Sequence, residues 1–525
     1  MKRYLLLSIT WLILTSCSDF LEEHSQDTIY VRTAESLEEL LLGEGYMAVE
    51  TTTSEISGTN FYYPYIHFMT DDTQESVTYA AGGGNHRKFI TDNIFGYYTY
   101  QPRVGVNYTN TSWANESKTW ERLYKHINVV NNVFDTEVNL PEAERNSEKC
   151  RQVLGEAHFL RGAYYFILVN LYGKPYTKET AATDPGVPLK LQGAILDKVF
   201  VREPVAKVYE QIVSDLKEAE RYLSTTPKPD IIYQADSTAV HLLLSRVFLY
   251  MQDWEQAAKY AQKVIDARPE LVELNGFTGG FLAKNSVETI FSMGSNVLAQ
   301  GIYYNCGAFR ISDDLYNSYG DNDLRKTIFM WKHGEFIGYT KVARRELTTS
   351  TPPAPTDAGY YTSYYSNNTT RSEVSGNFLL RTAEAYLNLA EAKAYLGEEI
   401  SARKALEDLR IKRIDANKYE ALNLSGKDLV DQIRLERRLE LCLEGHRWFD
   451  LRRYMVCEKY PESKPITQTF TVYANNYVFS NGEKRSYTLE AYDDAYTFAI
   501  PQEVIDFNTG MEQNPRPERN YVLVD

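Results

Sequence analysis

Residues 241–269 read HLLLSRVFLYMQDWEQAAKYAQKVIDARP and contain two amphipathic patterns separated by a short polar stretch. Their apolar residues recur three and four positions apart, which is typical of helices with one buried face. The stretch also fits the tetratricopeptide template, with the small residues Ser245, Ala257 and Ala261 at positions where two paired helices approach closely. The sequence therefore predicts one helix pair of a repeat between residues 241 and 269.

A second copy of the template begins at Tyr386, with Gly397 in the turn between the two helices. Other segments show the same amphipathic spacing: 118–135, 150–172, 205–223, 377–413 and 425–455. A chain of 525 residues is too long for one ordinary core, whereas stacked repeats can extend a core indefinitely. We expect a mainly α protein, built on a right-handed, tetratricopeptide-like helical solenoid with long loops and short β-hairpins added to it.

Three regions lack this helical pattern. Residues 52–116 and 270–376 are rich in Gly, Asn, Thr and Tyr, which predicts loops and short strands. Residues 469–492 alternate with a period of two around Asn481-Gly482, which predicts a β-hairpin turning at that dipeptide.

The N-terminus has the order of a secretory signal. Lys2 and Arg3 precede an apolar run, and LTSC at residues 14–17 resembles the lipobox of bacterial lipoproteins. This resemblance implies a signal peptide over 1–16, lipid attachment (including palmitate) at Cys17, and a tether over 17–33 that leads to a first helix near residue 34. An ordinary signal peptide with an incidental cysteine is the alternative. No later apolar run approaches the roughly 20 residues that span a bilayer, so we expect a water-soluble mature body.

Charge and cysteine content exclude several classes of partner and cofactor. The formal net charge of −15 repels phosphate backbones, which argues against a nucleic-acid partner. The five cysteines show no zinc-ligand or disulfide spacing, and four of them are expected to be buried. We therefore expect no metal and no cofactor.

Tyrosine is unusually frequent, with 41 residues. Tyrosines in the helical segments recur at core spacing, whereas many others lie in the Gly- and Asn-rich regions. A tyrosine ring offers an apolar face and a polar rim, which suit a sugar ring. Packing against the scaffold remains the alternative for any single tyrosine. The predicted ligand-binding residues are Asp72, Tyr79, Asn85, His86, Tyr97, Tyr98, Tyr303, Tyr304, Arg310, Tyr360 and Tyr361.

One segment raises the possibility of catalysis. Glu436, Glu440 and Glu444 are spaced by four, and paired carboxylates are the machinery of glycoside hydrolases. However, Arg437 lies three residues before Glu440, Arg447 three after Glu444 and Asp450 three after Arg447, which predicts ion pairs within one helix. Neighbouring arginines lower the pKa of a carboxyl, the opposite of what a catalytic acid needs. Since the sequence also contains no HExxH or GxSxG, we expect no catalytic residues.

Several stretches together resemble the SusD/RagB family of outer-membrane lipoproteins. They are CSDFLEE (17–23), LGEAHFLRGAYYFILVNLYGKPY (154–176), FLLRTAEAYLNLAEAKAYLG (378–397), IRLERRLELCLEGHRWFDLRRY (433–454) and FAIPQEVIDFNTGMEQNP (498–515). In the last of these, FNTGMEQNP departs from the usual ending of the family. The resemblance implies an N-terminal region over 34–269, a ligand-binding insertion over 270–376 and a C-terminal region over 377–525.

This resemblance also implies a function. Family members are non-catalytic, surface-exposed subunits that bind a nutrient and pass it to a SusC-like TonB-dependent barrel in the outer membrane. We therefore expect a cell-surface lipoprotein that captures an oligosaccharide or polysaccharide. Three alternatives stay open: a peptide-binding RagB-like uptake subunit, a secreted glycosidase, and a purely structural repeat adaptor.

Overall fold

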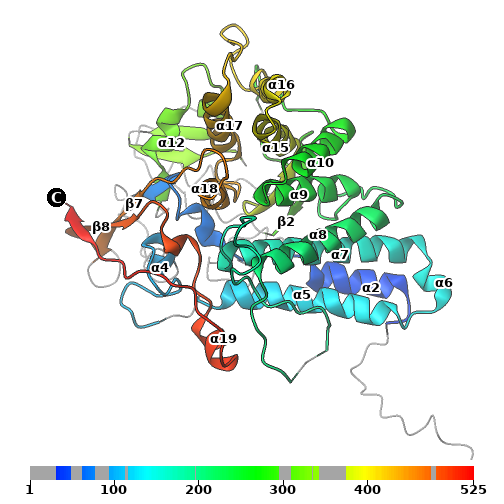
Figure 1. Cartoon of the computed structure of the whole chain (residues 1–525). Helices are drawn as coiled ribbons and strands as arrows, with labels where there is room; N and C mark the ends of the chain where they lie inside the picture. The colour runs from blue at the N-terminus through cyan, green and yellow to red at the C-terminus, as the bar shows by residue number, and fades with distance from the viewer. Residues whose placement is uncertain are drawn as a thin grey trace, which may run out of the picture.

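The protein is a stack of antiparallel helices with small sheets and short helices along one flank (Figure 1). The computed structural model describes residues 31–48, 62–76, 94–112, 116–194, 197–278, 280–294, 309–333, 335–341, 374–473 and 480–524. All structural statements below concern these residues.

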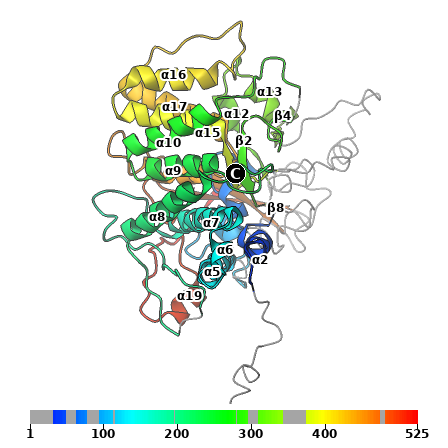
Figure 2. The ribbon, with the colours of Figure 1, turned by 90° about the vertical axis from the view of Figure 1, so that its right-hand side faces the viewer.

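The long helices follow one another through the stack. They are α5 (Lys118–Glu137), α7 (Glu148–Tyr172), α8 (Val205–Leu223), α9 (Ser237–Tyr250), α10 (Trp254–Ala267), α15 (Thr382–Tyr395), α16 (Glu399–Arg410) and α17 (Gly426–Leu441). Each packs against the next, and Figure 2 shows them rising from α5 to α16. The predicted mainly α, repeat-like scaffold is thereby confirmed, and α2 (Ala34–Leu40) begins where the first helix was expected.

The two template matches are both helix pairs. In the first pair, α9 and α10, Ser245 is fully buried and its Oγ donates to the carbonyl of Ala257, 2.9 Å away. In the second pair, α15 and α16, the turn contains Gly397 with φ +78°, a conformation that side-chain-bearing residues rarely adopt. The helices α10 and α15 also pack directly on one another, although more than 100 residues of chain separate them. The stack is therefore continuous across the loop-rich region.

Close approach of α7 and α8 depends on two glycines. A Cβ at Gly155 would lie 2.6 Å from Cγ of Leu223, and one at Gly162 would lie 3.0 Å from Cγ of Leu216. Because α7 is covered on nearly every side, it is apolar around most of its circumference and shows little amphipathic pattern. It forms the centre of the lower half of the stack.

The strands form four small antiparallel sheets. These pair β1 (Thr73–Glu75) with β3 (Phe309–Ile311), β2 (Thr289–Met293) with β6 (Phe378–Arg381), β4 (Met330–His333) with β5 (Phe336–Tyr339), and β8 (Ser480–Leu489) with both β7 (Ile466–Tyr473) and β9 (Val522–Val524). Shorter helical elements connect them: η1 (Leu41–Gly45), η2 (Pro64–His67), α4 (Phe95–Tyr98), α6 (Glu142–Arg145), α12 (Asp313–Ser318), α13 (Arg325–Ile328), α18 (Arg447–Tyr454), η4 (Asp494–Tyr496) and α19 (Gln502–Phe507).

The structure differs in detail from the sequence-based prediction in three segments. The predicted hairpin exists, but Asn481-Gly482 lies inside β8 at an irregularity in the pairing, where Gly482 has φ +86°. Tyr473 and Ser480 face each other across the pair, so the pairing already begins before Asn481. Residues 378–381 form strand β6 rather than helix, and the helical pattern of 425–455 is divided into α17 and α18.

One large cluster of buried apolar side chains extends from α2 to the segment after α19, and a small second cluster contains Tyr395, Val430, Tyr454 and Cys457. Cys150, Cys442 and Cys457 are buried free thiols, as predicted, whereas Cys17 and Cys306 lie outside the described residues. In the described ranges, no helix is both long and apolar enough to cross a membrane. The same ranges contain no group of three or more His, Cys, Asp or Glu side chains that could hold a metal ion.

Glu156 is a buried carboxylic acid on α7 for which we predict an unusual pH response. Tyr46 Oη donates to it at 2.5 Å and Gln152 Nε2 at 3.0 Å, but burial dominates and raises its pKa from 4.5 to about 7. Because the folded protein holds this proton up to about pH 7 and the unfolded chain loses it near pH 4.5, this source of stability declines as the pH rises through 7. Glu156→Gln should therefore raise the free energy of unfolding by about 2–3 kcal/mol at pH 8 and by little at pH 5.

Urea unfolding at the two pH values tests this prediction. Glu148→Gln, at an exposed position on the same helix, is the control and should behave like the wild type at both. Equal stabilisation by Glu156→Gln at pH 5 and pH 8 would contradict the role assigned to burial.

Candidate functional site

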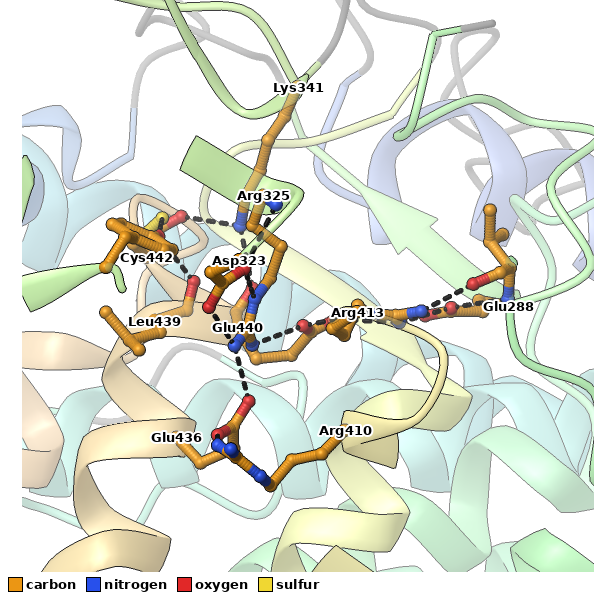
Figure 3. A network of polar contacts seen from close by, with 12 residues as sticks. Glu288, Asp323, Arg325, Lys341, Arg410, Arg413, Glu436, Leu439, Glu440 and Cys442 are labelled. Atoms are coloured by element: carbon orange, nitrogen blue, oxygen red, sulfur yellow. Dashed lines mark hydrogen bonds and ion pairs between the residues drawn. The ribbon is translucent and has the colours of Figure 1, made fainter. Parts of the chain in front are cut away.

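The charged segment over α17 and α18 was the one candidate for catalysis, and the structure places it in the interior. Glu436 and Glu440 are fully buried, and Glu444 is 2% exposed. All three carboxylates face cationic side chains that come from other parts of the chain. Figure 3 shows Glu436 and Glu440 with Arg325, Arg410 and Arg413 around them.

Glu440 is at the centre of this arrangement. Its carboxylate accepts hydrogen bonds from Arg325 Nη1 at 3.0 Å, Arg381 Nη1 at 2.7 Å and Arg413 Nε at 2.9 Å. Glu444 accepts from Lys341 Nζ at 2.6 Å and from Arg381 Nε at 2.7 Å. Thus both carboxylates are saturated by donors.

Further ion pairs extend this arrangement to ten side chains, which we call the buried charge network. Arg325 pairs with Asp323 at 2.7 Å and with Glu436 at 2.6 Å, while Glu288 joins Arg381 and Arg413 at 2.9 and 2.6 Å. The five acidic members are Glu288, Asp323, Glu436, Glu440 and Glu444, and the five basic members are Arg325, Lys341, Arg381, Arg410 and Arg413. The formal charges balance, which makes burial of so many ions tolerable.

The network makes a catalytic role for these carboxylates chemically unfavourable. Burial raises the pKa of Glu440, but the charges of Arg413, Arg381 and Arg325 outweigh it and hold the pKa well below its ordinary value. The pKa of Glu444 is likewise lowered, because Arg381 and Lys341 outweigh the effect of burial. Neither group carries a proton to donate at neutral pH, and neither is accessible to a substrate. The three carboxylates are thus held in buried ion pairs.

The predicted pairing within one helix is wrong. Helix α17 ends at Leu441, so Glu444 and Arg447 do not share a helix with Glu440. Arg437 instead donates to Asp450 on α18 at 2.9 Å, and Arg447 pairs with Asp71 at 2.8 Å. These pairs join separate elements rather than stabilising one helix.

The structure corrects three of the predicted ligand-binding residues. Asp72 is 1% exposed, and its Oδ1 accepts from Arg438 Nε at 2.8 Å. Tyr97 and Tyr98 are 1% and 0% exposed. Tyr97 stacks on Tyr65 with the ring centres 3.6 Å apart, and Tyr98 Oη donates to the carbonyl of Thr469 at 2.9 Å. Side chains so enclosed pack the core and present no face to a sugar.

Arg310 differs from these three because it lies near the surface. It projects from β3 with 13% of its side chain exposed and pairs with Asp313 of α12 at 2.7 Å. The other predicted residues lie outside the described part of the chain: Cys17, Tyr79, Asn85, His86, Tyr303, Tyr304, Tyr360 and Tyr361.

Described residues that flank four undescribed segments (49–61, 77–93, 295–308 and 342–373) lie close together. The Gly294 amide donates to the carbonyl of Met47 at 3.3 Å, and the Ser375 amide donates to Ser292 Oγ at 2.8 Å. In β1 and β3, Glu75 lies opposite Phe309. No local sequence pattern indicates these contacts, because they join residues more than 80 positions apart.

Asn377 and Lys341 also fix these flanks. Asn377 Oδ1 lies 2.6 Å from His67 Nε2, and its carbonyl accepts from Tyr63 Oη at 3.4 Å. Lys341 is fully buried and donates to Glu444 as well as to the carbonyl oxygens of Glu440 and Cys442. Consequently, the described residues on both sides of segment 342–373 are held by buried polar contacts, with η2 on one side and with the end of α17 on the other.

Comparison with known proteins agrees with this architecture. A model of the SusD family matches residues 316–516, and a second model, described as starch-binding associating with outer membrane, matches residues 50–249. The chain belongs to the SusD family. The charged segment of α17 and α18 and the helix pair of α15 and α16 fall in the first match. The second match contains α5, α7, α8 and all but the last residue of α9.

Individual SusD-family relatives are distant. SusD-like protein P2 of Formosa agariphila is 27% identical over 378 residues, covering 64% of this chain and 71% of the relative. Starch-binding protein SusD of Bacteroides thetaiotaomicron is 26% identical over 183 residues, 34% of this chain and 30% of that protein. A solved SusD superfamily protein from B. thetaiotaomicron is 22% identical, with a TM-score of 0.65 over 92% of this chain and 100% of its own, and this likeness establishes the fold.

Proposed function

We propose that this SusD-family protein is a cell-surface lipoprotein that captures an oligosaccharide or polysaccharide without cleaving it. We further propose that it delivers the glycan to a SusC-like TonB-dependent transporter in the outer membrane. The observation that carries the proposal is the pair of SusD-type matches, which together involve both halves of the chain and one of which is described as starch-binding.

The structure supports a division of labour between scaffold and loops. The helical stack is held by a continuous apolar core and by balanced buried ions, so it can support long connections on its surface. Residues that flank the four undescribed segments contact one another, Met47 with Gly294, Ser292 with Ser375 and Glu75 with Phe309. Those segments contain most of the tyrosines proposed to bind the glycan. The proposed ligand-binding residues are Tyr79, Asn85, His86, Tyr303, Tyr304, Arg310, Tyr360 and Tyr361.

The proposed chemistry favours moderate affinity. Stacking on an aromatic ring contributes on the order of 1 kcal/mol, so several rings and hydrogen bonds give dissociation constants in the micromolar to millimolar range. Weak capture suits a subunit that has to release its ligand to a transporter.

A glycan panel tests this function. The purified protein should be retarded by at least one polysaccharide in affinity electrophoresis and should generate no new reducing ends. The double variant Tyr303→Ala/Tyr304→Ala should weaken binding at least about tenfold, because two stacking rings are lost. Tyr492→Ala, which removes an exposed tyrosine from the turn after β8, is the matched control and should bind like the wild type.

Different results would separate the alternatives. Release of sugar products would identify a glycosidase and overturn the proposal. Binding of basic peptides but of no glycan would favour a RagB-like peptide-uptake subunit. Wild-type binding by the double variant would remove Tyr303 and Tyr304 from the proposed site.

Membrane attachment is tested separately through Cys17. Cys17→Ala should release the protein from the membrane fraction, because it removes the proposed site of lipid attachment. Its thermal unfolding and glycan binding should be unchanged, since Cys17 precedes α2 and the scaffold helices in the chain. Cell fractionation followed by immunoblotting measures the outcome, and a variant that stays in the membrane fraction would contradict the lipobox interpretation.

A further inference from the structure

Exposed apolar side chains come together where the connection between α7 and α8 meets α19. Val199 and Val201 of that connection are 52% and 62% exposed, and Phe507 at the end of α19 is 80% exposed. The amide of Phe200 donates to Asn508 Oδ1 at 2.9 Å, which joins the two segments. Figures 1 and 2 both draw α19 below α5, so we call Val199, Val201 and Phe507 the lower apolar patch.

Neighbouring contacts fix the segments that carry this patch. Asn508 Nδ2 donates to the carbonyl of Val504 at 2.9 Å, and Val504 packs against the large apolar cluster. Arg202, next to Val201, donates from Nη2 to the carbonyl of Tyr172 at 3.0 Å. The three apolar side chains therefore remain in water although the backbone beside them is anchored to the scaffold. Apolar groups held at the surface in this way mark interaction sites.

The proposed lipid anchor brings a bilayer within reach of this part of the molecule. Cys17 precedes Val31 by 14 positions, and a chain of that length spans at most about 50 Å. It leads into α2, which packs on α5 in the same lower part of the stack (Figure 1). An anchored protein meets the bilayer surface at a high effective concentration, so even a weak contact is populated.

The size and surroundings of the patch favour a shallow contact with lipid. Three side chains expose too little area for a stable protein–protein interface, which buries about 800 Å² of each partner. Partial insertion of a few apolar side chains is enough to orient a protein that is already anchored. The neighbouring residues Asp197, Lys198, Glu503 and Asp506 are exposed and charged, so they remain in the hydrated headgroup layer and limit the depth of insertion.

We infer that the lower apolar patch rests at the boundary between headgroups and acyl chains of a lipid bilayer and orients the anchored protein with α19 toward the membrane. Helix α16 then lies at the end of the stack that is remote from the membrane (Figure 2). This inference rests on the proposed lipoprotein role and not on glycan binding. The contact is too small to replace the anchor, which agrees with the expected release of Cys17→Ala.

Quenching of tryptophan by brominated lipid tests the contact. The full lipidated chain with Phe507→Trp is reconstituted in phosphatidylcholine vesicles with and without dibrominated phosphatidylcholine, and the emission of the wild type is subtracted. Bromine quenches only those tryptophans that reach the acyl chains. The emission added by Phe507→Trp should therefore fall roughly twofold in brominated vesicles and shift to shorter wavelength on vesicle binding. Tm should be unchanged, because the substituted side chain is exposed.

Ile400→Trp is the matched control. Ile400 is also 80% exposed but lies on α16 at the opposite end of the stack, so bromine should not quench the added tryptophan (Figure 2). If the chain floats with the vesicles and both variants, or neither, are quenched, the inferred orientation is wrong. A wavelength shift without bromine quenching would indicate contact between two copies of the chain and would also overturn it. A wild-type chain that does not float with the vesicles would overturn the lipoprotein proposal itself.

Discussion

Replacing Glu440 with glutamine is expected to lower the free energy of unfolding by about 3–5 kcal/mol, the usual cost of breaking a buried ion pair. This carboxylate binds Arg325, Arg381 and Arg413, all of which are at most 1% exposed. A glutamine has nearly the same shape but no charge, so the variant leaves the surrounding arginines with uncompensated positive charge. Guanidinium chloride unfolding at pH 7 measures the loss.

Asp428→Asn is the matched control for this substitution. Asp428 lies on the same helix, α17, but is exposed, so its replacement should change stability by no more than about 0.5 kcal/mol. Equal stability of Glu440→Gln and the wild type would contradict the importance of the buried charge network. A variant that folded normally but lost a glycan-cleaving activity would instead identify Glu440 as catalytic.

Acidification is expected to produce the second large effect, a steep loss of stability below about pH 5. Burial raises the pKa of Asp71, but Arg447 and Arg438 outweigh it and hold the pKa well below its ordinary value. Arg437 and Arg453 similarly lower the pKa of Asp450 against the effect of burial. With Glu440 and Glu444, these groups remain ionised in the folded protein at a pH at which the unfolded chain takes up protons.

The sign follows from proton linkage. When the unfolded state binds more protons, acid favours unfolding, and each unit by which a carboxyl pKa is depressed corresponds to about 1.4 kcal/mol that is lost as the pH falls through that range. Unfolding free energies measured between pH 7 and pH 3.5 should therefore decline most steeply below pH 5. A free energy of unfolding that stays constant between pH 7 and pH 3.5 would contradict this prediction, because it would mean that protonating the buried carboxylates costs no stability.

His67 adds an earlier phase to the same acid response. Burial lowers its pKa from 6.5 to about 4, so the folded protein keeps it neutral while the unfolded chain protonates it. It should contribute a loss of about 2–3 kcal/mol between pH 6.5 and pH 4. His67→Gln should flatten the stability curve in this interval only, and Asp428→Asn should follow the wild-type curve throughout.

The helical scaffold could be predicted from the sequence because its signals are local. Residues 241–269 encode both helices of a pair, and Gly397 marks the turn of another, through spacings of only a few residues. Helix α2 began at the expected position for the same reason. The break between α17 and α18 was not predicted, because it is short and the apolar spacing continues across it.

The roles of the polar and aromatic side chains were decided by tertiary structure. Glu440 finds its arginines 27, 59 and 115 residues away, so its spacing from Arg437 within the helix had no bearing on its partners. Tyr97 and Tyr98 lie in a Gly- and Tyr-rich region that suggests an exposed loop, yet they are enclosed by Tyr65, Phe309 and Phe498.

What the sequence determined by itself was therefore the type and order of the helices, the repeat and the family pattern, since these depend on periodicities along the chain. Which charges pair, which tyrosines are buried and which segment flanks meet depend on contacts between residues far apart in the chain. Burial and ion pairing are properties of the three-dimensional surroundings of a side chain, and only the folded stack of helices creates those surroundings.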